Sequence, residues 1–177
     1  MAGAHNQAMP ASIVMTVLAA DRPGLVRALS ETVAAHGGSW QESRMARLAG
    51  QFAGILRVEC AESETEALLA ALAALEGEGI SVQAKREVAA PAEKRETLAL
   101  DVMGNDRPGI IRSLSAAIAG AGGNVEDLST SLESAPMSGH PIFHAKGIVS
   151  LAAGNAPGAL IEAIENLGPD LSVSVEQ

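Results

Sequence analysis

The chain has 177 residues, of which 47% are hydrophobic and 19% are charged, and this balance is typical of a globular protein and excludes a disordered one. The formal charge of −9 argues against direct nucleic-acid binding, because phosphate backbones are bound chiefly through lysine and arginine. The longest apolar run, residues 67–75, is much shorter than the roughly 20 residues of a membrane-spanning helix. Residues 1–10 lack the features of a secretory signal, so a cytoplasmic protein is expected.

The residue types that hold metals and redox cofactors are scarce. Cys60 is the only cysteine, so the chain forms neither an internal disulfide nor a cysteine-rich metal cluster. Three aromatic residues are too few to line a cofactor pocket or to stack on single-stranded bases. His140 and His144 lie four residues apart, within or beside a predicted strand, but no third ligand accompanies them. We therefore expect no cofactor and no metal.

The chain contains an internal repeat. The tetrapeptide Asp-Arg-Pro-Gly occurs at residues 21–24 and again at residues 106–109, an offset of 85. At the same offset, Leu29-Ser30 meets Leu114-Ser115 and Gly37-Gly38 meets Gly122-Gly123. Because several separate matches keep one spacing, the chain is predicted to hold two copies of one module.

The spacing between the copies changes later in the sequence. Gly54-Ile55 matches Gly147-Ile148 best, at an offset of 93, which predicts eight extra residues around 134–141 of the second copy. Residues 89–95 are small and charged around a central proline, as in a solvated linker. The predicted division is a first module at 10–88, a linker at 89–95 and a second module at 96–177.

Each copy opens with a short apolar run, residues 12–20 or 97–103, that predicts a buried strand. Pro23 and Pro108 then suit the first turn of a helix, where the missing amide hydrogen is not needed. Apolar residues follow at helical spacing until a glycine pair ends the pattern. The first half of each copy is therefore a strand followed by a helix.

The second half of each copy begins with a predicted hairpin. Its strands are expected at residues 39–48 and 52–59 of the first copy, and at 124–132 and 142–151 of the second. A second helix follows, with Ser63 or Asn155 as its expected N-cap and Pro157 in its first turn in the second copy. Alternating apolar residues at 80–84 and 171–175 predict a final strand.

The resulting order, βαββαβ, occurs twice and predicts an α+β fold. It is the ferredoxin-like arrangement, in which two helices cover one face of a four-stranded antiparallel sheet. A module of about 80 residues buries only a modest fraction of its surface and is marginal alone. We therefore expect the modules to pair with each other or across a homodimer.

The repeated motif also resembles a known family. Asp-Arg-Pro-Gly-Leu/Ile, followed about twelve residues later by Gly-Gly-Ser/Asn, is similar to the ACT domain, a small βαββαβ module that senses amino acids. Both copies match this pattern. A chain of two such modules, with no attached catalytic or DNA-binding domain, resembles the glycine cleavage system transcriptional repressors. The resemblance implies a ligand where the loop after the first strand enters the first helix, often at an interface between two modules.

The chemistry of that loop suits a small amino acid. The start of a helix exposes unpaired amide hydrogens and a partial positive charge that suit a carboxylate, and the ligand's ammonium needs oxygen acceptors. Arg22 or Arg107 is an alternative partner for the carboxylate, and both loops are also explained as capping structures that bind nothing. The candidate ligand-binding residues are Asp21, Arg22, Pro23, Gly24, Leu25, Asn105, Asp106, Arg107, Pro108, Gly109 and Ile110.

These features favour a regulatory protein over an enzyme. No acid, base and nucleophile recur with the spacing of a catalytic site, so no catalytic residue is predicted. The leading hypothesis is a sensor of a small amino acid, such as glycine or serine, that acts on transcription through a protein partner, because the acidic chain is unsuited to DNA itself. The alternative is a dissociable regulatory subunit of an amino-acid-metabolising enzyme.

Overall fold

The computed structural model describes residues 9–91 and 93–176, and the chain divides into two compact units between Ala90 and Pro91. Residues 1–8, residue 92 of the predicted linker and residue 177 lie outside the described residues. Within the described part, each helix is too short or too polar to cross a lipid bilayer.

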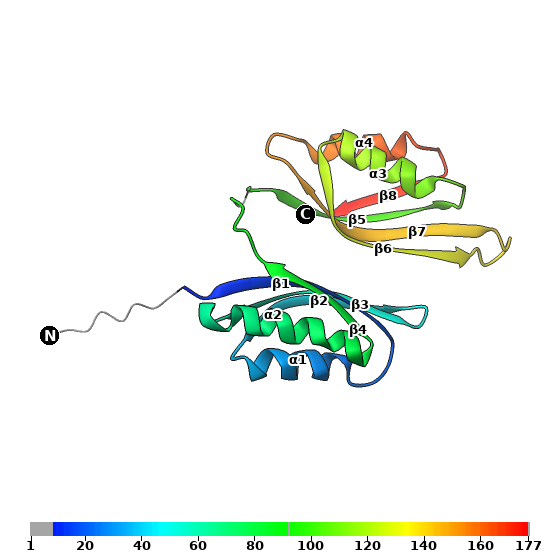
Figure 1. Cartoon of the computed structure of the whole chain (residues 1–177). Helices are drawn as coiled ribbons and strands as arrows, with labels where there is room; N and C mark the ends of the chain where they lie inside the picture. Colours follow the sequence, from blue (N-terminus) through cyan, green and yellow to red (C-terminus); the bar gives the residue numbers. More distant parts are fainter. Residues whose placement is uncertain (1–8, 92, 177) are drawn as a thin grey trace. The chain divides into compact units, whose positions relative to one another are not determined.

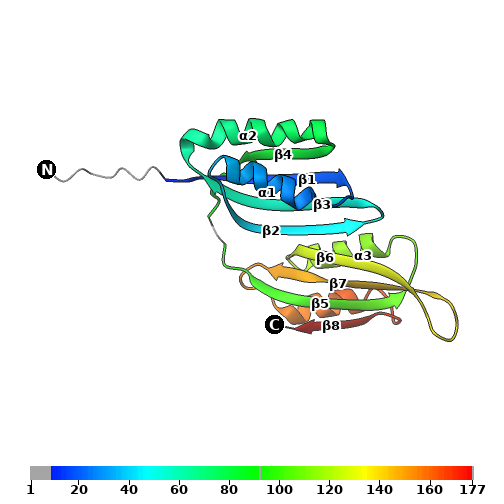
Figure 2. The same cartoon turned by 90° about the horizontal axis from the view of Figure 1, so that it is seen from below.

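The first unit is one four-stranded antiparallel sheet with two helices on one face (Figure 1). Its strand order is β2-β3-β1-β4, which can be followed from edge to edge in Figure 2. Two short 3₁₀ turns, Glu62–Glu64 and Leu75–Glu78, flank the second helix. The elements are β1 (Ala11–Ala20), α1 (Leu25–Ala35), β2 (Ser39–Leu48), β3 (Gln51–Cys60), α2 (Thr65–Ala74) and β4 (Ile80–Arg86).

The second unit repeats this arrangement, with strand order β6-β7-β5-β8. Its strands are also antiparallel, and α3 and α4 lie on one face of the sheet (Figure 1). The predicted α+β class with two ferredoxin-like modules is confirmed. The elements are β5 (Glu96–Asn105), α3 (Ile110–Gly120), β6 (Gly123–Ser134), β7 (Pro141–Leu151), α4 (Pro157–Glu165) and β8 (Ser172–Glu176).

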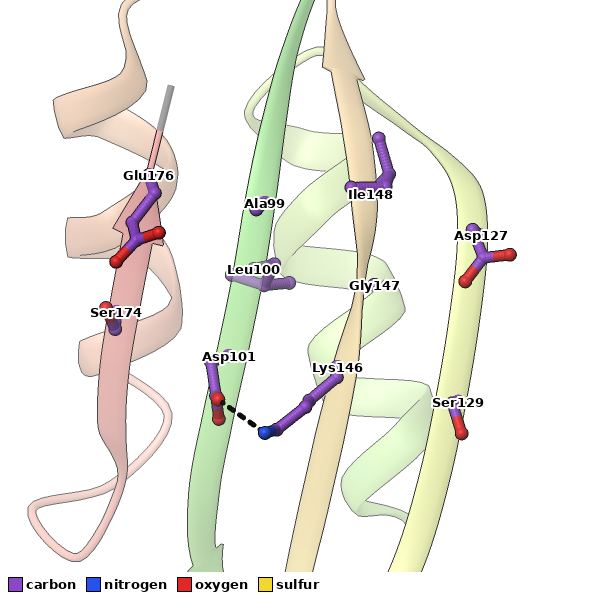
Figure 3. Close-up of a pocket in the computed structure, with 10 residues that line it drawn as sticks. All are labelled: Ala99, Leu100, Asp101, Asp127, Ser129, Lys146, Gly147, Ile148, Ser174 and Glu176. Carbon is purple, nitrogen blue, oxygen red and sulfur yellow. Dashed lines mark ion pairs between the residues drawn. The ribbon is translucent and has the colours of Figure 1, made fainter.

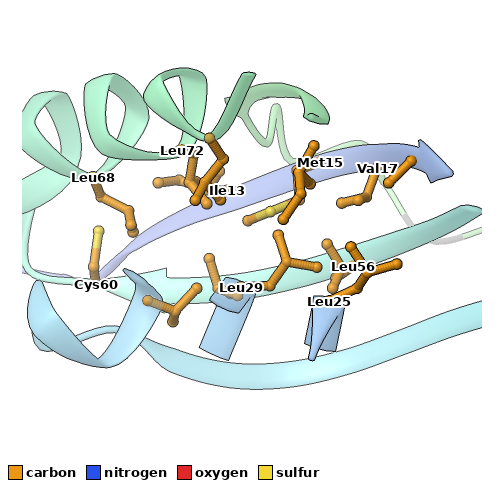
Figure 4. Close-up of a cluster of buried hydrophobic side chains, with 14 residues drawn as sticks. Ile13, Met15, Val17, Leu25, Leu29, Leu56, Cys60, Leu68 and Leu72 are labelled. Carbon is orange, nitrogen blue, oxygen red and sulfur yellow. The ribbon is translucent and has the colours of Figure 1, made fainter. Parts of the chain in front are cut away.

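The core of each module lies between the sheet and its helices, because the strands alternate buried and exposed residues. In β1, Ile13, Met15 and Val17 point to the helices and are at most 3% exposed. Leu29 of α1 and Leu72 of α2 meet them from the other side and are fully buried (Figure 4). A strand period of two and a helical period near four thus bury one stripe of each element. The other face of each sheet carries the remaining side chains of its strands.

Both first helices begin later than the sequence predicts. Pro23 and Pro108 were expected in the first turn, but α1 begins at Leu25 and α3 at Ile110. The residue before each helix is a glycine in the left-handed conformation, with φ of 90° at Gly24 and 80° at Gly109. Because this conformation is not helical, the helix cannot include the proline that precedes it.

The predicted caps of the second helices are also wrong. Ser63 lies inside the 3₁₀ turn, and α2 begins after it with no side-chain cap. Asn155 stands one residue too early, since Ala156 is the N-cap of α4 and makes no side-chain bond. Pro157 does occupy the start of α4, as predicted. Glu64, the last residue of the 3₁₀ turn, is the N-cap of α2, so Ser63 also stands one residue too early.

Strand pairing corrects the offset between the copies. Ala20 pairs with Gln51 in the first module, and Asn105 pairs with Ile142 in the second. The partners are 91 positions apart, rather than the 93 predicted from matching glycines. The second copy therefore has six extra residues rather than eight, and they lie in the β6–β7 turn, where they were expected.

Candidate functional site

The β1–α1 loop of the first module, residues 21–24, is tied to the β2–β3 hairpin. The Asp21 amide donates to the Gly50 carbonyl at 2.9 Å. The Asp21 carboxylate accepts from Arg47 Nη1 of β2 at 3.2 Å. Asp21 is therefore held in place at the edge of the loop, with a cation beside it. Sequence reasoning missed Arg47, because nothing local to residue 47 indicates that β2 brings it to this loop.

The two loop arginines have the same role in both modules. Arg22 Nη2 donates to the Glu78 carbonyl at 2.8 Å, and Arg107 Nη2 donates to the Leu167 carbonyl at 2.8 Å. Both carbonyls lie just after the second helix, where unpaired carbonyls and the helix dipole favour a cation. Each arginine thus fastens its loop to the end of the second helical segment. This contact favours backbone amides over the arginines as partners for a ligand carboxylate.

The second loop has an additional anchor, Asp170. Its Oδ2 accepts from the Asn105 amide at 3.0 Å, and its Oδ1 lies 3.3 Å from Arg107 Nη1. The hydrogen bond from the Asn105 amide and the charge of Arg107 hold the pKa of Asp170 below its usual value. Gly79 occupies the equivalent position of the first module, 91 residues earlier, so this anchor is specific to the second loop.

The start of the first helix is open in both modules. A Cβ added at Gly24 or Gly109 meets nothing within 4 Å, and neither α1 nor α3 has a side-chain cap. The first amides of a helix have no acceptor within the helix itself. Leu25 and Ile110 are buried at 3% and 5% exposure, so their side chains belong to the core. Only their backbone could contact a ligand, and in the second module the Ile110 amide already donates to the Arg107 carbonyl at 3.2 Å.

The remaining candidates separate the two loops further. Pro23 and Pro108 are exposed and have no amide hydrogen to offer. Within the described residues, the Asp106 carboxylate makes no hydrogen bond or ion pair. Leu132 stands where the first module has Arg47. The structure thus groups the predicted residues at two similar loops, in which the acidic side chain is paired only in the first.

Three surface hollows lie away from these loops. Two are on the sheet faces that the helices leave uncovered, and the third is beside Ser12 and Arg86. In the described part of the chain, no group of three histidine, cysteine or acidic side chains is arranged to hold a metal ion. None of these three hollows includes a residue of the β1–α1 loop or the β5–α3 loop.

Comparisons with known proteins agree with this architecture. The ACT domain family matches residues 11–84, and no curated protein matches the sequence. The crystal structure of an unknown protein from Galdieria sulphuraria has 25% identity and a TM-score of 0.78, over 95% of this chain and 98% of that one. A structure described as a candidate glycine cleavage system transcriptional repressor has 19% identity and a TM-score of 0.67, over 95% and 97%. The first module therefore belongs to the ACT domain family, and the second, which shares its fold, is an ACT-like module.

Proposed function

We propose that the protein is a non-catalytic sensor of a small amino acid, such as glycine or serine, that binds at the β1–α1 loop, the β5–α3 loop or both. The observation that carries the proposal is the repeated loop geometry. Gly24 and Gly109 have the same left-handed conformation, and Arg22 and Arg107 each donate to a backbone carbonyl beyond the second helix of their module. An ACT-domain fold accompanies both loops.

The loop supplies the groups that a zwitterion needs. The first amides of α1 or α3 suit the ligand carboxylate. The carboxylates of Asp21 and Asp106, with the side-chain oxygen of Asn105, suit its ammonium. Because the helix starts are open, a ligand there needs contacts from a second surface. We predict that another module supplies that surface.

Occupancy of the loop is the proposed signal. A ligand shifts an arrangement of modules only if it binds one arrangement more tightly than another. The output is proposed to be transcription, reached through a protein partner, because a chain of charge −9 is unsuited to bind DNA directly.

Titration of the full chain with the common amino acids tests the sensor. Ligand at a hundred times its Kd adds about 2.7 kcal/mol to stability, so calorimetric heat and a rise in melting temperature are expected with glycine, serine or a similar small amino acid. Asp21→Asn or Asp106→Asn should weaken this binding, while Glu162→Gln on the exposed face of α4 should not. The absence of heat and of a thermal shift with every amino acid would refute the sensor.

The protein partner is tested separately by native co-purification. Recovery with a DNA-binding regulator is expected. Recovery with an amino-acid-metabolising enzyme instead would establish the alternative, a dissociable regulatory subunit.

A further inference from the structure

The open face of the second sheet carries a hollow that the loop proposal does not use. It has a volume of about 400 Å³ and is lined by residues from all four strands (Figure 3). This volume lies within the range of small-molecule sites, which is roughly 300–1,000 Å³. Its lining combines a lysine, three carboxylates and two serine hydroxyls with a small apolar floor. The hollow therefore presents both signs of charge to one small volume.

Strand pairing arranges the lining residues in two rows across the sheet. The first row is Ser174, Asp101, Lys146 and Ser129. The second row is Glu176, Ala99, Ile148 and Asp127. The rows are two residues apart along the strands, which corresponds to about 6.7 Å.

The first row contains an exposed ion pair. Lys146 Nζ lies 3.4 Å from Asp101 Oδ2 (Figure 3), and their side chains are 63% and 42% exposed. The other oxygen of Asp101 accepts from His144 Nε2 at 2.8 Å, and this bond lowers the pKa of Asp101, so the carboxylate stays charged at neutral pH. A zwitterionic ligand can exchange this one ion pair for two, because its carboxylate can pair with Lys146 and its ammonium with Asp101.

The second row favours a cation at the far end of the ligand. Ala99 has only a methyl group and leaves space between Glu176 and Ile148 (Figure 3). Glu176 pairs directly with Ala99, so its carboxylate borders that space, and Asp127 adds negative charge from β6. The row spacing of about 6.7 Å is close to the length of an extended lysine side chain, so the apolar stem would cross Ala99 and the ammonium would reach Glu176.

The open face of the first sheet has a hollow of its own, of about 570 Å³, but different side chains line it. The equivalent positions hold Val14, Thr16, Ile55 and Lys85 in place of Ala99, Asp101, Lys146 and Glu176. In that hollow Val14 and Thr16 stand in place of Ala99 and Asp101, and Lys85 would repel a cationic side chain. The copies keep one fold and differ at these four positions, so the fold does not require the residues that the second module has there.

We propose that the open face of the second sheet binds a cationic α-amino acid, with its carboxylate on Lys146, its α-ammonium on Asp101 and its side-chain cation on Glu176. This site is separate from the two loops and does not depend on them.

Calorimetric titration of the full chain with L-lysine tests the site, with L-norleucine as the ligand that has the same stem and no cation. Lysine should bind at least about tenfold more tightly than norleucine, the factor that about 1.4 kcal/mol of charge pairing represents. Binding should weaken as salt is raised, because the site is exposed. Equal affinities for the two ligands, or no binding of lysine, would overturn the proposal.

Three variants locate the binding. Ala99→Leu fills the hollow from an exposed position and should abolish lysine binding while the melting temperature is retained. Glu176→Gln should weaken lysine binding about tenfold, whereas Lys85→Gln at the equivalent position of the first module should not weaken it. Lysine binding that survives Ala99→Leu would contradict the site.

The loop variants distinguish this proposal from the sensor proposal. Asp21→Asn and Asp106→Asn should weaken glycine or serine binding and leave lysine binding unchanged. If lysine binding instead follows the loop variants and ignores Ala99→Leu, the sheet site is wrong and the loop sites stand. If lysine binds at the sheet and no small amino acid binds at the loops, the sensor proposal alone fails.

Discussion

Replacing Gly109 with alanine tests why a glycine precedes α3. Its φ of 80° lies in the left-handed region, and an added Cβ meets nothing within 4 Å. The substitution therefore causes no collision, and its cost is backbone strain alone, about 1–2 kcal/mol for an L-residue. Urea denaturation of the full chain, followed by circular dichroism, should show this loss of stability.

Gly158 of α4 provides the matched control in the same module. Its added Cβ also meets open space, but its φ is not in the left-handed region. Because alanine is the better helix former, Gly158→Ala should leave stability unchanged or raise it by up to about 1 kcal/mol. Equal effects of the two substitutions would show that backbone conformation is not the reason for glycine at 109. The loop geometry on which the sensor proposal depends would then lose its physical basis.

Three further substitutions test other parts of the fold. Leu29→Ala removes a fully buried side chain of α1 and should cost about 2–5 kcal/mol in urea denaturation. Gly147→Ala would place a Cβ against the backbone carbonyl of Asp127, so β6 must shift, and thermal unfolding should show a loss of about 1–3 kcal/mol. Asp170→Asn should destabilise the protein at pH 7, because the folded-state pKa of Asp170 is lowered. That stabilisation is present above the unfolded pKa, near 3.8, and is lost as pH falls through the lower folded value, so the stabilities of variant and parent should begin to converge below about pH 4.

The fold was predictable because its signals are local and occur twice. Burial follows a period of two in β1 and a helical period in α1, and both patterns are visible in the sequence. The starts of the helices were less predictable. The proline rule places Pro23 inside α1, but the left-handed conformation of Gly24 moves the start to Leu25, and φ at a glycine cannot be deduced from composition. Local pattern therefore determines which elements form, while individual backbone angles determine where they begin.

The partners of the candidate loop residues were not predictable, because strand pairing brings them from distant parts of the chain. Arg47 reaches Asp21 across the β2–β3 hairpin. Asp170 reaches Arg107 from the segment that precedes β8. Neither residue belongs to a local motif. Their positions follow from the strand register, which the sequence comparison set two residues too far.

The source of that error is also physical. Gly54 and Gly147 match by residue type, but an added Cβ at Gly54 would come nearest to the Met45 side chain, whereas at Gly147 it would come nearest to the Asp127 carbonyl of β6. Each glycine is therefore explained by close contact with the neighbouring strand of its own module. The two glycines are not equivalent, because Leu56 occupies the first-module position that corresponds to Gly147. Once strand pairing sets the offset at 91, the corresponding positions of the two sheets can be compared residue by residue. The copies differ on the open faces of their sheets, where packing against the helices does not restrict the residue type. On that face the second module has the charged residues of the proposed site.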